Sequence, residues 1–242
     1  MTEPTTLFRA EWGSRAYGTH TEASDRDIIQ VVIEPPEYIT GLFQFHAKAE
    51  STAEFGHRSF AEDTDTVTYG LNKFAALATD GNPQVMATLW LTEFIKRNEL
   101  FSLLQNNRHL CVSKNSGRKY LGYMKSQRMN MEGLKKGKTN RPELVHSHGY
   151  DTKFAMHAVR LGFQGLELMQ TGEIRLPMQG EALQRCRDIR AGLVRKETAL
   201  RLIREMEKEL EAEIEKSDLP ELGDKARMSD ILHTIYEFDW NR

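Results

Sequence analysis

The sequence predicts an α+β fold, with an α/β domain followed by a helical domain. Two strand patterns fall in the first seventy residues, a β-branched run at 28–33 and a shorter one at 66–69. From about residue 151 onward, apolar residues recur at helical spacing instead. We therefore predict three regions: an α/β domain over 1–112, a basic connecting segment over 113–148 and a helical domain over 149–242.

Turn residues set the limits of the N-terminal elements. The strand at 28–33 stops at Pro35-Pro36, because proline has no N–H to donate to a strand ladder. The stretch from 43 to 60 is polar and favours neither helix nor strand. A helix is expected over 71–78 from its apolar spacing, and the turn residues at 80–83 end it.

Helices account for the elements that follow. A short helix is expected over 85–94, with Trp90 and Phe94 in the core. Asp151 is placed to cap a helix that closes at Thr171-Gly172. A long helix over 196–217 combines one apolar face with i, i+4 charge pairs on the other, and we assign no chemistry to it.

Composition excludes several classes of protein. The 242 residues carry a formal net charge of −2 and are 39% hydrophobic, which argues against disorder. No apolar run approaches the ~20 residues of a membrane helix, and the start of the chain lacks a signal-peptide pattern. Cys111 and Cys186 stand far apart, so a disulfide framework or cysteine zinc site is not expected. We expect a soluble, cytoplasmic protein without a membrane partner.

The near-neutral total hides a basic middle segment. Residues 113–141 contain nine Lys and Arg against one Glu, whereas residues 1–112 contain nine basic and fifteen acidic side chains. Such a segment, interleaved with Tyr and Met, is typical of a polyanion-binding surface. A solvated connector would have the same composition, and both interpretations stay open. The candidate nucleic-acid-binding residues are Lys119, Lys125, Arg128, Lys135, Lys136 and Lys138.

The chemistry lies in the stretch that leads into the first strand pattern. Asp25 and Asp27 are two residues apart, so both carboxylates project from one face of an extended chain. Two carboxylates on one face repel unless a cation lies between them, and Mg²⁺ takes one or two carboxylates plus substrate phosphates. Upstream, Gly13-Ser14 can turn into a helix start whose N–H groups favour phosphate. Alone, each pattern is usually a surface turn; together they indicate phosphoryl or nucleotidyl transfer.

These motifs resemble the nucleotidyltransferase superfamily of DNA polymerase beta, and more narrowly the predicted nucleotidyltransferases called RlaP. The likeness spans most of the chain in order. One departure is visible: the family places a basic residue and a glycine after the Asp-x-Asp strand start, where this chain has Ile29-Gln30. The shared motifs are Gly13-Ser14-Arg15-Ala16-Tyr17-Gly18, Ser24-Asp25-Arg26-Asp27, Pro35-Pro36-Glu37-Tyr38-Ile39-Thr40-Gly41-Leu42, Tyr69-x-Leu71-x-Lys73-Phe74, Gly81-Asn82-Pro83, Gly149-Tyr150-Asp151-x-Lys153-Phe154-Ala155-x-His157-Ala158-x-Arg160-Leu161 and Thr171-Gly172-Glu173-Ile174.

The resemblance implies a small mixed-sheet nucleotidyltransferase domain and a third carboxylate on a neighbouring strand. Asp65, directly before the 66–69 strand, is the first candidate, and Asp63 is the alternative. In the superfamily's two-metal scheme, Asp25 and Asp27 bridge both ions and the third acid holds one of them. The implied cofactor is Mg²⁺ or Mn²⁺, the implied substrate is an NTP, and Gly13 and Ser14 bind its phosphates.

Lys153, His157 and Arg160 stand at i, i+4 and i+7, on one face of the helix that Asp151 caps. They could clamp a triphosphate or an acceptor backbone, since Arg suits phosphate geometry. The alternative is the polar face of a buried helix. The match to the family at these three positions favours nucleotide binding.

The resemblance implies transfer of a nucleoside monophosphate, with release of pyrophosphate, to a hydroxyl acceptor. The family's association with RNA repair points to an RNA 3′ end, such as that of a tRNA, and to an RNA ligase in the same pathway. Two alternatives stay open. One is modification of a protein hydroxyl, as in toxin–antitoxin nucleotidyltransferases, and the other is an inactive RNA-binding protein that retains the fold.

Overall fold

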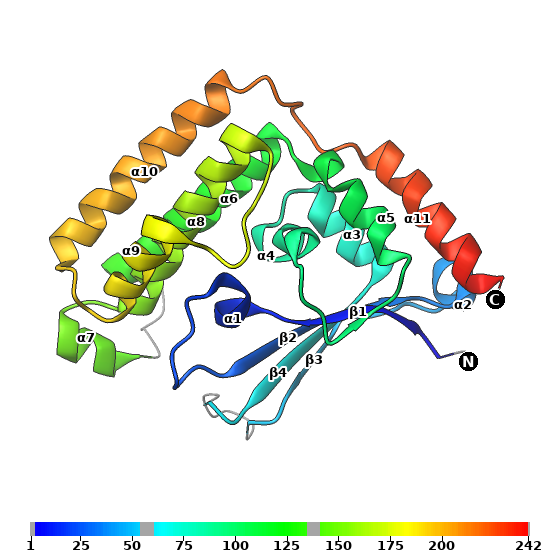
Figure 1. Cartoon of the computed structure of the whole chain (residues 1–242), viewed down its shortest axis with the longest axis horizontal. Coiled ribbons are helices and arrows are strands. Elements are labelled where there is room, and N and C mark those ends of the chain that lie inside the picture. Colours follow the sequence, from blue (N-terminus) through cyan, green and yellow to red (C-terminus); the bar gives the residue numbers. More distant parts are fainter. Residues whose placement is uncertain (1–2, 54–60, 135–140, 242) are drawn as a thin grey trace. The chain divides into compact units, whose positions relative to one another are not determined.

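The structure is a computed structural model that describes residues 3–53, 61–134 and 141–241 (Figure 1). The chain divides into two compact units. The first, which we call the sheet unit, comprises Met1–Asp80, Gln84–Cys111 and Asp224–Arg242. The second, which we call the helical unit, comprises Gly81–Pro83 and Val112–Gly223.

A five-stranded mixed sheet organises the sheet unit, in the order β3-β4-β2-β1-β5. The central pair β2 and β4 is parallel, and the other pairs are antiparallel. Both strands predicted from the sequence are present, each longer than its β-branched centre. The strands are β1 (Thr5–Glu11), β2 (Arg26–Ile33), β3 (Lys48–Ser51), β4 (Thr64–Gly70) and β5 (Lys96–Arg97).

Helices cover one face of this sheet (Figure 1). At the centre of their interface, the Phe8 ring of β1 lies 5.6 Å from Phe74 and 4.3 Å from Phe101, between centroids. All three side chains are fully buried, and burial of one such ring stabilises a fold by about 1.5–3 kcal/mol. The helices are α1 (Gly13–Tyr17), α2 (Pro36–Ile39), α3 (Leu71–Thr79), α5 (Phe101–Asn106) and α11 (Lys225–Trp240), with 3₁₀ turns at Ala87–Trp90 and Arg108–Cys111.

The helix expected over 85–94 is shorter in the structure. The α-helix α4 (Pro83–Met86) passes into the 3₁₀ turn, and Leu91 is extended. Trp90 is buried as expected. Phe94 lies beyond the helix and joins the aromatic core, with its ring centroid 6.0 Å from that of Phe8.

A buried glutamate fixes the last helix, α11, to the sheet unit. The Tyr236 hydroxyl donates to the Glu34 carboxylate at 2.7 Å, and the backbone N–H of Leu71 donates to the same oxygen at 2.8 Å. The Trp240 indole N–H donates to the backbone oxygen of Glu34 at 2.9 Å. Gly70 makes room for this arrangement, since a Cβ there would stand 2.0 Å from the Glu34 carboxylate.

The helical unit is built around α8 (Thr152–Thr171), which packs against α6, α9 and α10. Two glycines of α8 allow this close packing. A Cβ at Gly162 would lie 2.7 Å from the Met206 methyl, and one at Gly165 would lie 2.8 Å from Leu210. The other helices of the unit are α6 (Lys114–Glu132), α7 (Pro142–His148), α9 (Gly180–Arg190) and α10 (Lys196–Lys216).

This division differs from the predicted domains in two places. The predicted connecting segment is largely the helix α6, because Ser113 and Ser116 form a capping box and Tyr120, Leu121 and Met124 are buried along it. The C-terminal helix α11 belongs to the sheet unit, because Glu34 holds it there. Among the helices of the described residues, none is long and apolar enough to span a membrane.

Candidate active site

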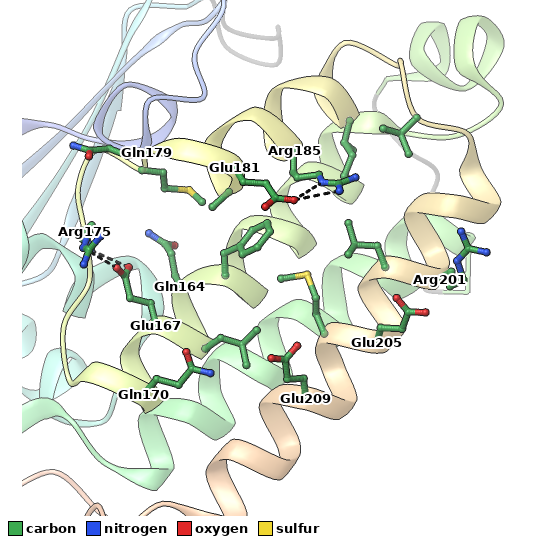
Figure 2. A pocket seen from close by; sticks show the side chains of 18 of the residues that line it. Gln164, Glu167, Gln170, Arg175, Gln179, Glu181, Arg185, Arg201, Glu205 and Glu209 are labelled. Atoms are coloured by element: carbon green, nitrogen blue, oxygen red, sulfur yellow. Dashed lines mark hydrogen bonds and ion pairs between the residues drawn. The ribbon is translucent and has the colours of Figure 1, made fainter.

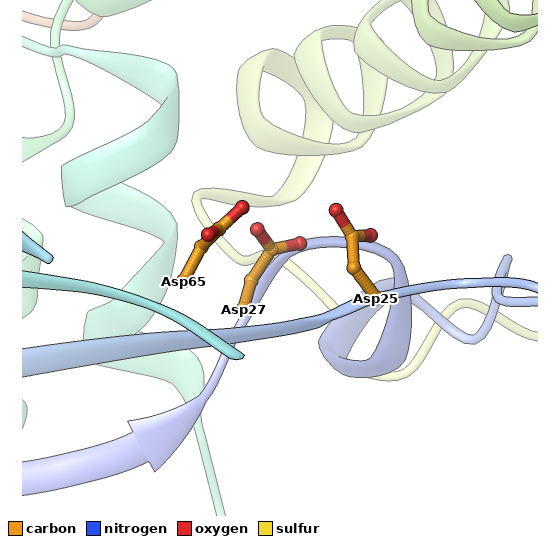
Figure 3. Close-up of side chains that lie close together, drawn as sticks. All are labelled: Asp25, Asp27 and Asp65. Atoms are coloured by element: carbon orange, nitrogen blue, oxygen red, sulfur yellow. The ribbon is translucent and has the colours of Figure 1, made fainter. Parts of the chain in front are cut away.

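Three carboxylates converge at one end of the central strand pair (Figure 3). Asp25 precedes β2, Asp27 lies in β2 and Asp65 lies in β4. The parallel register places Asp27 directly opposite Asp65, so the two side chains share a face of the sheet. One oxygen from each of the three residues lies within 4.8 Å of the others, and all three side chains are partly exposed.

The cluster contains Asp65 and not the alternative Asp63. The Asp63 carboxylate accepts a hydrogen bond from the Thr52 hydroxyl at 3.1 Å, next to the edge strand β3. Its backbone oxygen accepts from Arg26 N–H at 2.9 Å, which starts the β2–β4 pairing. The Asp63 carboxylate is therefore engaged by Thr52, outside the cluster, and only its backbone oxygen takes part in the strand pairing.

The Gly-Ser motif forms the first turn of α1 and lies against Asp27. Gly13 has a φ of +59°, a conformation that favours glycine, and a Cβ there would stand 1.9 Å from the Asp27 carboxylate. The Trp12 N–H donates to the backbone oxygen of Asp27 at 2.8 Å. Tyr17 is buried against the Trp12 ring, as expected for a packing residue. The turn and the carboxylate thus fix each other's position.

The donor set fits a divalent cation of the Mg²⁺ or Mn²⁺ class. All three groups offer carboxylate oxygen, which these ions prefer, and three carboxylates this close repel one another unless a cation lies between them.

In addition, the Ser14 hydroxyl is buried with no hydrogen-bond partner among the described residues. This donor, in the turn that begins at Gly13, is available for a phosphate oxygen of a bound substrate.

The predicted nucleotide-binding residues of α8 lie in the helical unit. Asp151 caps the helix as predicted, by accepting from the N–H groups of Lys153 and Phe154 at 3.0 and 3.2 Å. It also pairs with Arg141 at 3.0 Å, in an ion pair whose two side chains are both nearly buried. Arg160 is only 7% exposed and donates to the Gln164 side-chain oxygen at 2.6 Å.

His157 lies within a cluster of cations. Its pKa is lowered well below the usual range, first because the ring is buried and then because Arg160 and Lys153 are close, with smaller effects of Arg141 and Arg190. The imidazole is therefore neutral at neutral pH. The motif at 153, 157 and 160 predicts part of this cluster. Arg141, just before α7, and Arg190, at the end of α9, carry no local signal.

The basic middle segment is largely paired within the helical unit. Lys125 pairs with Glu211 at 3.5 Å, and Arg128 pairs with Glu207 at 2.8 Å and with Glu132. Lys119 lies on the same helix, α6, and nucleic-acid binding through these three residues stays a prediction. Lys135, Lys136 and Lys138, also predicted to bind nucleic acid, lie outside the described residues.

Fold and site together define a class: nucleotidyltransferases of the DNA polymerase beta type. The chain belongs to the RlaP family, described as the RNA repair pathway DNA polymerase beta family, whose sequence pattern matches residues 2–231. The resemblance of the motifs to this family is thereby confirmed.

Two known proteins are similar to the chain. An uncharacterized 38.9 kDa protein of Enterobacteria phage T4, from the nrdC-mobD intergenic region, is 28% identical over 127 residues. That match covers 50% of this chain and 37% of the phage protein's length. The crystal structure of a nucleotidyltransferase-like protein from Exiguobacterium sibiricum 255-15 is 10% identical, with a TM-score of 0.31, over 88% of this chain and 69% of that one.

Proposed function

We propose that this protein transfers a nucleoside monophosphate from an NTP to the 3′ hydroxyl of an RNA, such as a tRNA awaiting repair. The observation that carries the proposal is the cluster of Asp25, Asp27 and Asp65, held in place by the Gly13 turn. The chain belongs to a DNA polymerase beta family whose description names an RNA repair pathway, and this supports both the proposed reaction and the proposed acceptor.

The chain's own residues supply position and charge for this reaction. Divalent ions would neutralise the three carboxylates, so that a triphosphate could bind near them. They would also lower the pKa of the attacking hydroxyl. Asp25 and Asp27 would hold such ions from β2, and Asp65 would hold one of them from β4. Ser14 would donate its hydroxyl to a phosphate oxygen. The hydroxyl oxygen bonds to the α-phosphorus, the bond to the β-phosphate breaks and pyrophosphate leaves, while the hydroxyl proton passes to solvent.

Charge distribution supports a polyanionic acceptor. The helical unit contains 21 basic and 16 acidic residues, whereas the sheet unit contains 12 and 19. Lys153 and Arg160, together with Arg141 and Arg190, form the cation cluster around His157. Because contacts of Lys and Arg with phosphates release counterions, we expect RNA binding that weakens steeply as salt rises.

The direct test is incubation of the purified protein with total tRNA, Mg²⁺ and each α-labelled NTP in turn. Asp25→Asn serves as the inactive variant, and Asp63→Asn is the matched control because it changes a neighbouring acid outside the cluster. We expect label on RNA with the native protein and Asp63→Asn, and none with Asp25→Asn.

Two other results would contradict the proposal in different ways. Label on a protein band would mean that the acceptor is a protein hydroxyl. RNA binding without labelling by any of the four nucleotides would mean a binding protein that retains the fold without the activity.

A further inference from the structure

A cavity of about 800 Å³ lies within the helical unit, between α8, α9 and α10 (Figure 2). Its rim carries ion pairs: Glu167 lies 3.3 Å from Arg175, and Glu181 lies 3.2 Å from Arg185. Because charges of both signs surround the opening, the rim favours neither an anionic nor a cationic ligand. The charges on the edges of the sheet are more selective, because their order along a strand decides which strand can pair with it.

The sheet has two edge strands, β3 and β5, and within the described residues each of them pairs on one side only. An edge strand presents backbone N–H and C=O groups to other chains, and many proteins protect such edges with short strands and cations. The edge at β5 has both features, since it consists of Lys96 and Arg97 alone. A second copy of β5 beside it would place cations opposite one another, which is destabilising. This edge therefore opposes pairing with itself.

The edge at β3 is open and longer. All four residues of Lys48–Ser51 are exposed. The Thr52 N–H donates to the backbone oxygen of Thr64 at 3.1 Å, and the register with β4 continues without a shift along β3. In an antiparallel pair, successive residues direct their N–H and C=O groups alternately toward the neighbouring strand and away from it. Counted back from Thr52, the backbone groups of Ser51 and Ala49 therefore point to the open edge.

The side chains of β3 carry one cation and one anion, Lys48 and Glu50, on either side of Ala49. If a second copy of β3 lies antiparallel with the two Ala49 residues opposite each other, each Lys48 faces the partner's Glu50. A shift of two residues is the smallest that keeps the outward backbone groups facing each other, and it places Lys48 opposite Lys48 or Glu50 opposite Glu50. Opposite charges that face each other across strands stabilise the pairing, and like charges destabilise it. Charge therefore selects one register, with two ion pairs.

We propose that a second copy of this chain pairs antiparallel with the β3 edge, centred on Ala49, and joins the two sheets into one. The Ala49 N–H of each copy donates to the backbone oxygen of the partner's Ala49, and the two Lys48–Glu50 pairs flank these bonds. The two-fold axis is perpendicular to the joined sheet, so the carboxylate clusters of both copies lie on the same face of it. A strand of four residues buries little area, so the dimer is weak and depends on concentration.

The experiment measures the oligomeric state of the full chain by sedimentation velocity over a range of concentrations. Lys48→Glu replaces both ion pairs by facing carboxylates, and Glu50→Lys replaces them by facing ammonium groups. The double variant Lys48→Glu/Glu50→Lys exchanges the two charges and restores both pairs. Lys208→Glu is the matched control, because it makes the same change of charge at an exposed position of α10, outside the sheet unit.

We expect the native chain to dimerise, and each single variant to raise the dissociation constant of the dimer about tenfold or more, because two cross-strand pairs become repulsive together. The double variant should dimerise within about threefold of the native chain, since only the coupling between the two positions is restored. Lys208→Glu should dimerise as the native chain does.

Ala49→Pro tests the backbone pairing separately from the charges. The Ala49 N–H points to the open edge, so proline removes the two central hydrogen bonds of the dimer without removing a bond to β4. We expect a monomer with the native circular dichroism spectrum. If this variant does not fold, the charge variants test the same contact.

A native chain that stays monomeric up to about 1 mM would overturn this inference. A dimer unchanged in both single variants and in Ala49→Pro would overturn it too, because the contact would then lie on another surface. A double variant as weak as the single variants would show that Lys48 and Glu50 do not face each other, and would overturn the proposed register. Each of these results leaves the proposed function intact, since nucleotidyl transfer does not depend on this contact.

Discussion

The two units of this protein carry their functional groups in different ways. In the sheet unit, three carboxylates are placed by backbone register, since parallel pairing sets Asp27 opposite Asp65. In the helical unit, the cations around His157 come from segments that are distant in sequence, with Lys153 and Arg160 in α8, Arg141 just before α7 and Arg190 at the end of α9. The first arrangement depends on strand register and on the close approach of the Gly13 turn, whereas the second depends on side chains from several helices.

The largest effect is expected where backbone and carboxylate meet, at Gly13. In Gly13→Ala the new Cβ would stand 1.9 Å from the Asp27 carboxylate, at a φ that alanine rarely adopts. We expect at least a hundredfold loss of transfer activity, because displacement of a catalytic group by about 1 Å costs that much. Gly133→Ala is the control, since Gly133 also has a positive φ but a Cβ there meets no atom within 4 Å. If Gly13→Ala were as active as the native chain, the turn at Gly13 would not be needed to position the carboxylates of the active site.

The second largest effect is expected at the hydrogen bonds that hold α11 within the sheet unit. Burial, and then the neighbouring Glu34 carboxylate, raise the pKa of Tyr236, so this hydroxyl stays a donor at all ordinary pH values. Tyr236→Phe removes a hydrogen bond to a buried carboxylate, and we expect a loss of about 2 kcal/mol of stability in this unit.

Hydrogen exchange measures that loss unit by unit. In Tyr236→Phe, amides of α11 and α3 should exchange roughly thirtyfold faster, with those of α8 unchanged. Tyr123→Phe is the matched control in the helical unit, where the Tyr123 hydroxyl accepts from the uncharged Asn82 amide at 3.2 Å. Faster exchange of α8 in Tyr236→Phe would mean that the two units do not open independently.

A smaller, pH-dependent effect is expected at His157. Its pKa is lowered in the folded chain, so the unfolded state binds the extra proton more readily, and stability falls as pH drops below about 6.5. The slope is at most about 1.4 kcal/mol per pH unit for one group.

His157→Asn should remove this slope between about pH 5 and 6.5 and leave stability near pH 8 little changed. Urea unfolding at a series of pH values measures it. A variant with the native pH dependence would show that His157 is not the source of this slope.

The smallest effect is expected at the two cysteines of the native chain, one in each unit. Burial raises the pKa of both Cys111 and Cys186 to about 12, so neither forms a thiolate near neutral pH. Iodoacetamide should label neither in the folded protein and both in urea. In Tyr236→Phe, labelling of Cys111 should rise and that of Cys186 should not, which mass spectrometry of the peptides distinguishes.

What the sequence predicts well follows from local rules. Asp25 and Asp27 are identified by their spacing and by the strand behind them, and Asp151 and Gly172 by cap chemistry. The first strand, β1, is missed because Thr5–Glu11 shows no regular alternation of buried and exposed residues, its register being shifted between Thr6 and Phe8. The helix α6 is missed because its basic side chains hide a narrow apolar stripe.

The rest of the site depends on contacts that no local pattern encodes. Arg141 and Arg190 join the cluster around His157 from outside α8, the first from the residue before α7 and the second from the end of α9. Similarly, Glu34 and Tyr236 are 202 positions apart, so their pairing could not be predicted from spacing.

The most direct test of the central claim is Mn²⁺ binding by the full chain, followed by electron paramagnetic resonance. Mn²⁺ is the probe because it shares the oxygen preference of Mg²⁺. The native protein and Asp63→Asn should bind Mn²⁺, and Asp27→Asn should lose that binding while keeping the native circular dichroism spectrum. Undiminished Mn²⁺ binding by a folded Asp27→Asn variant would contradict the assignment of the three carboxylates as the metal site.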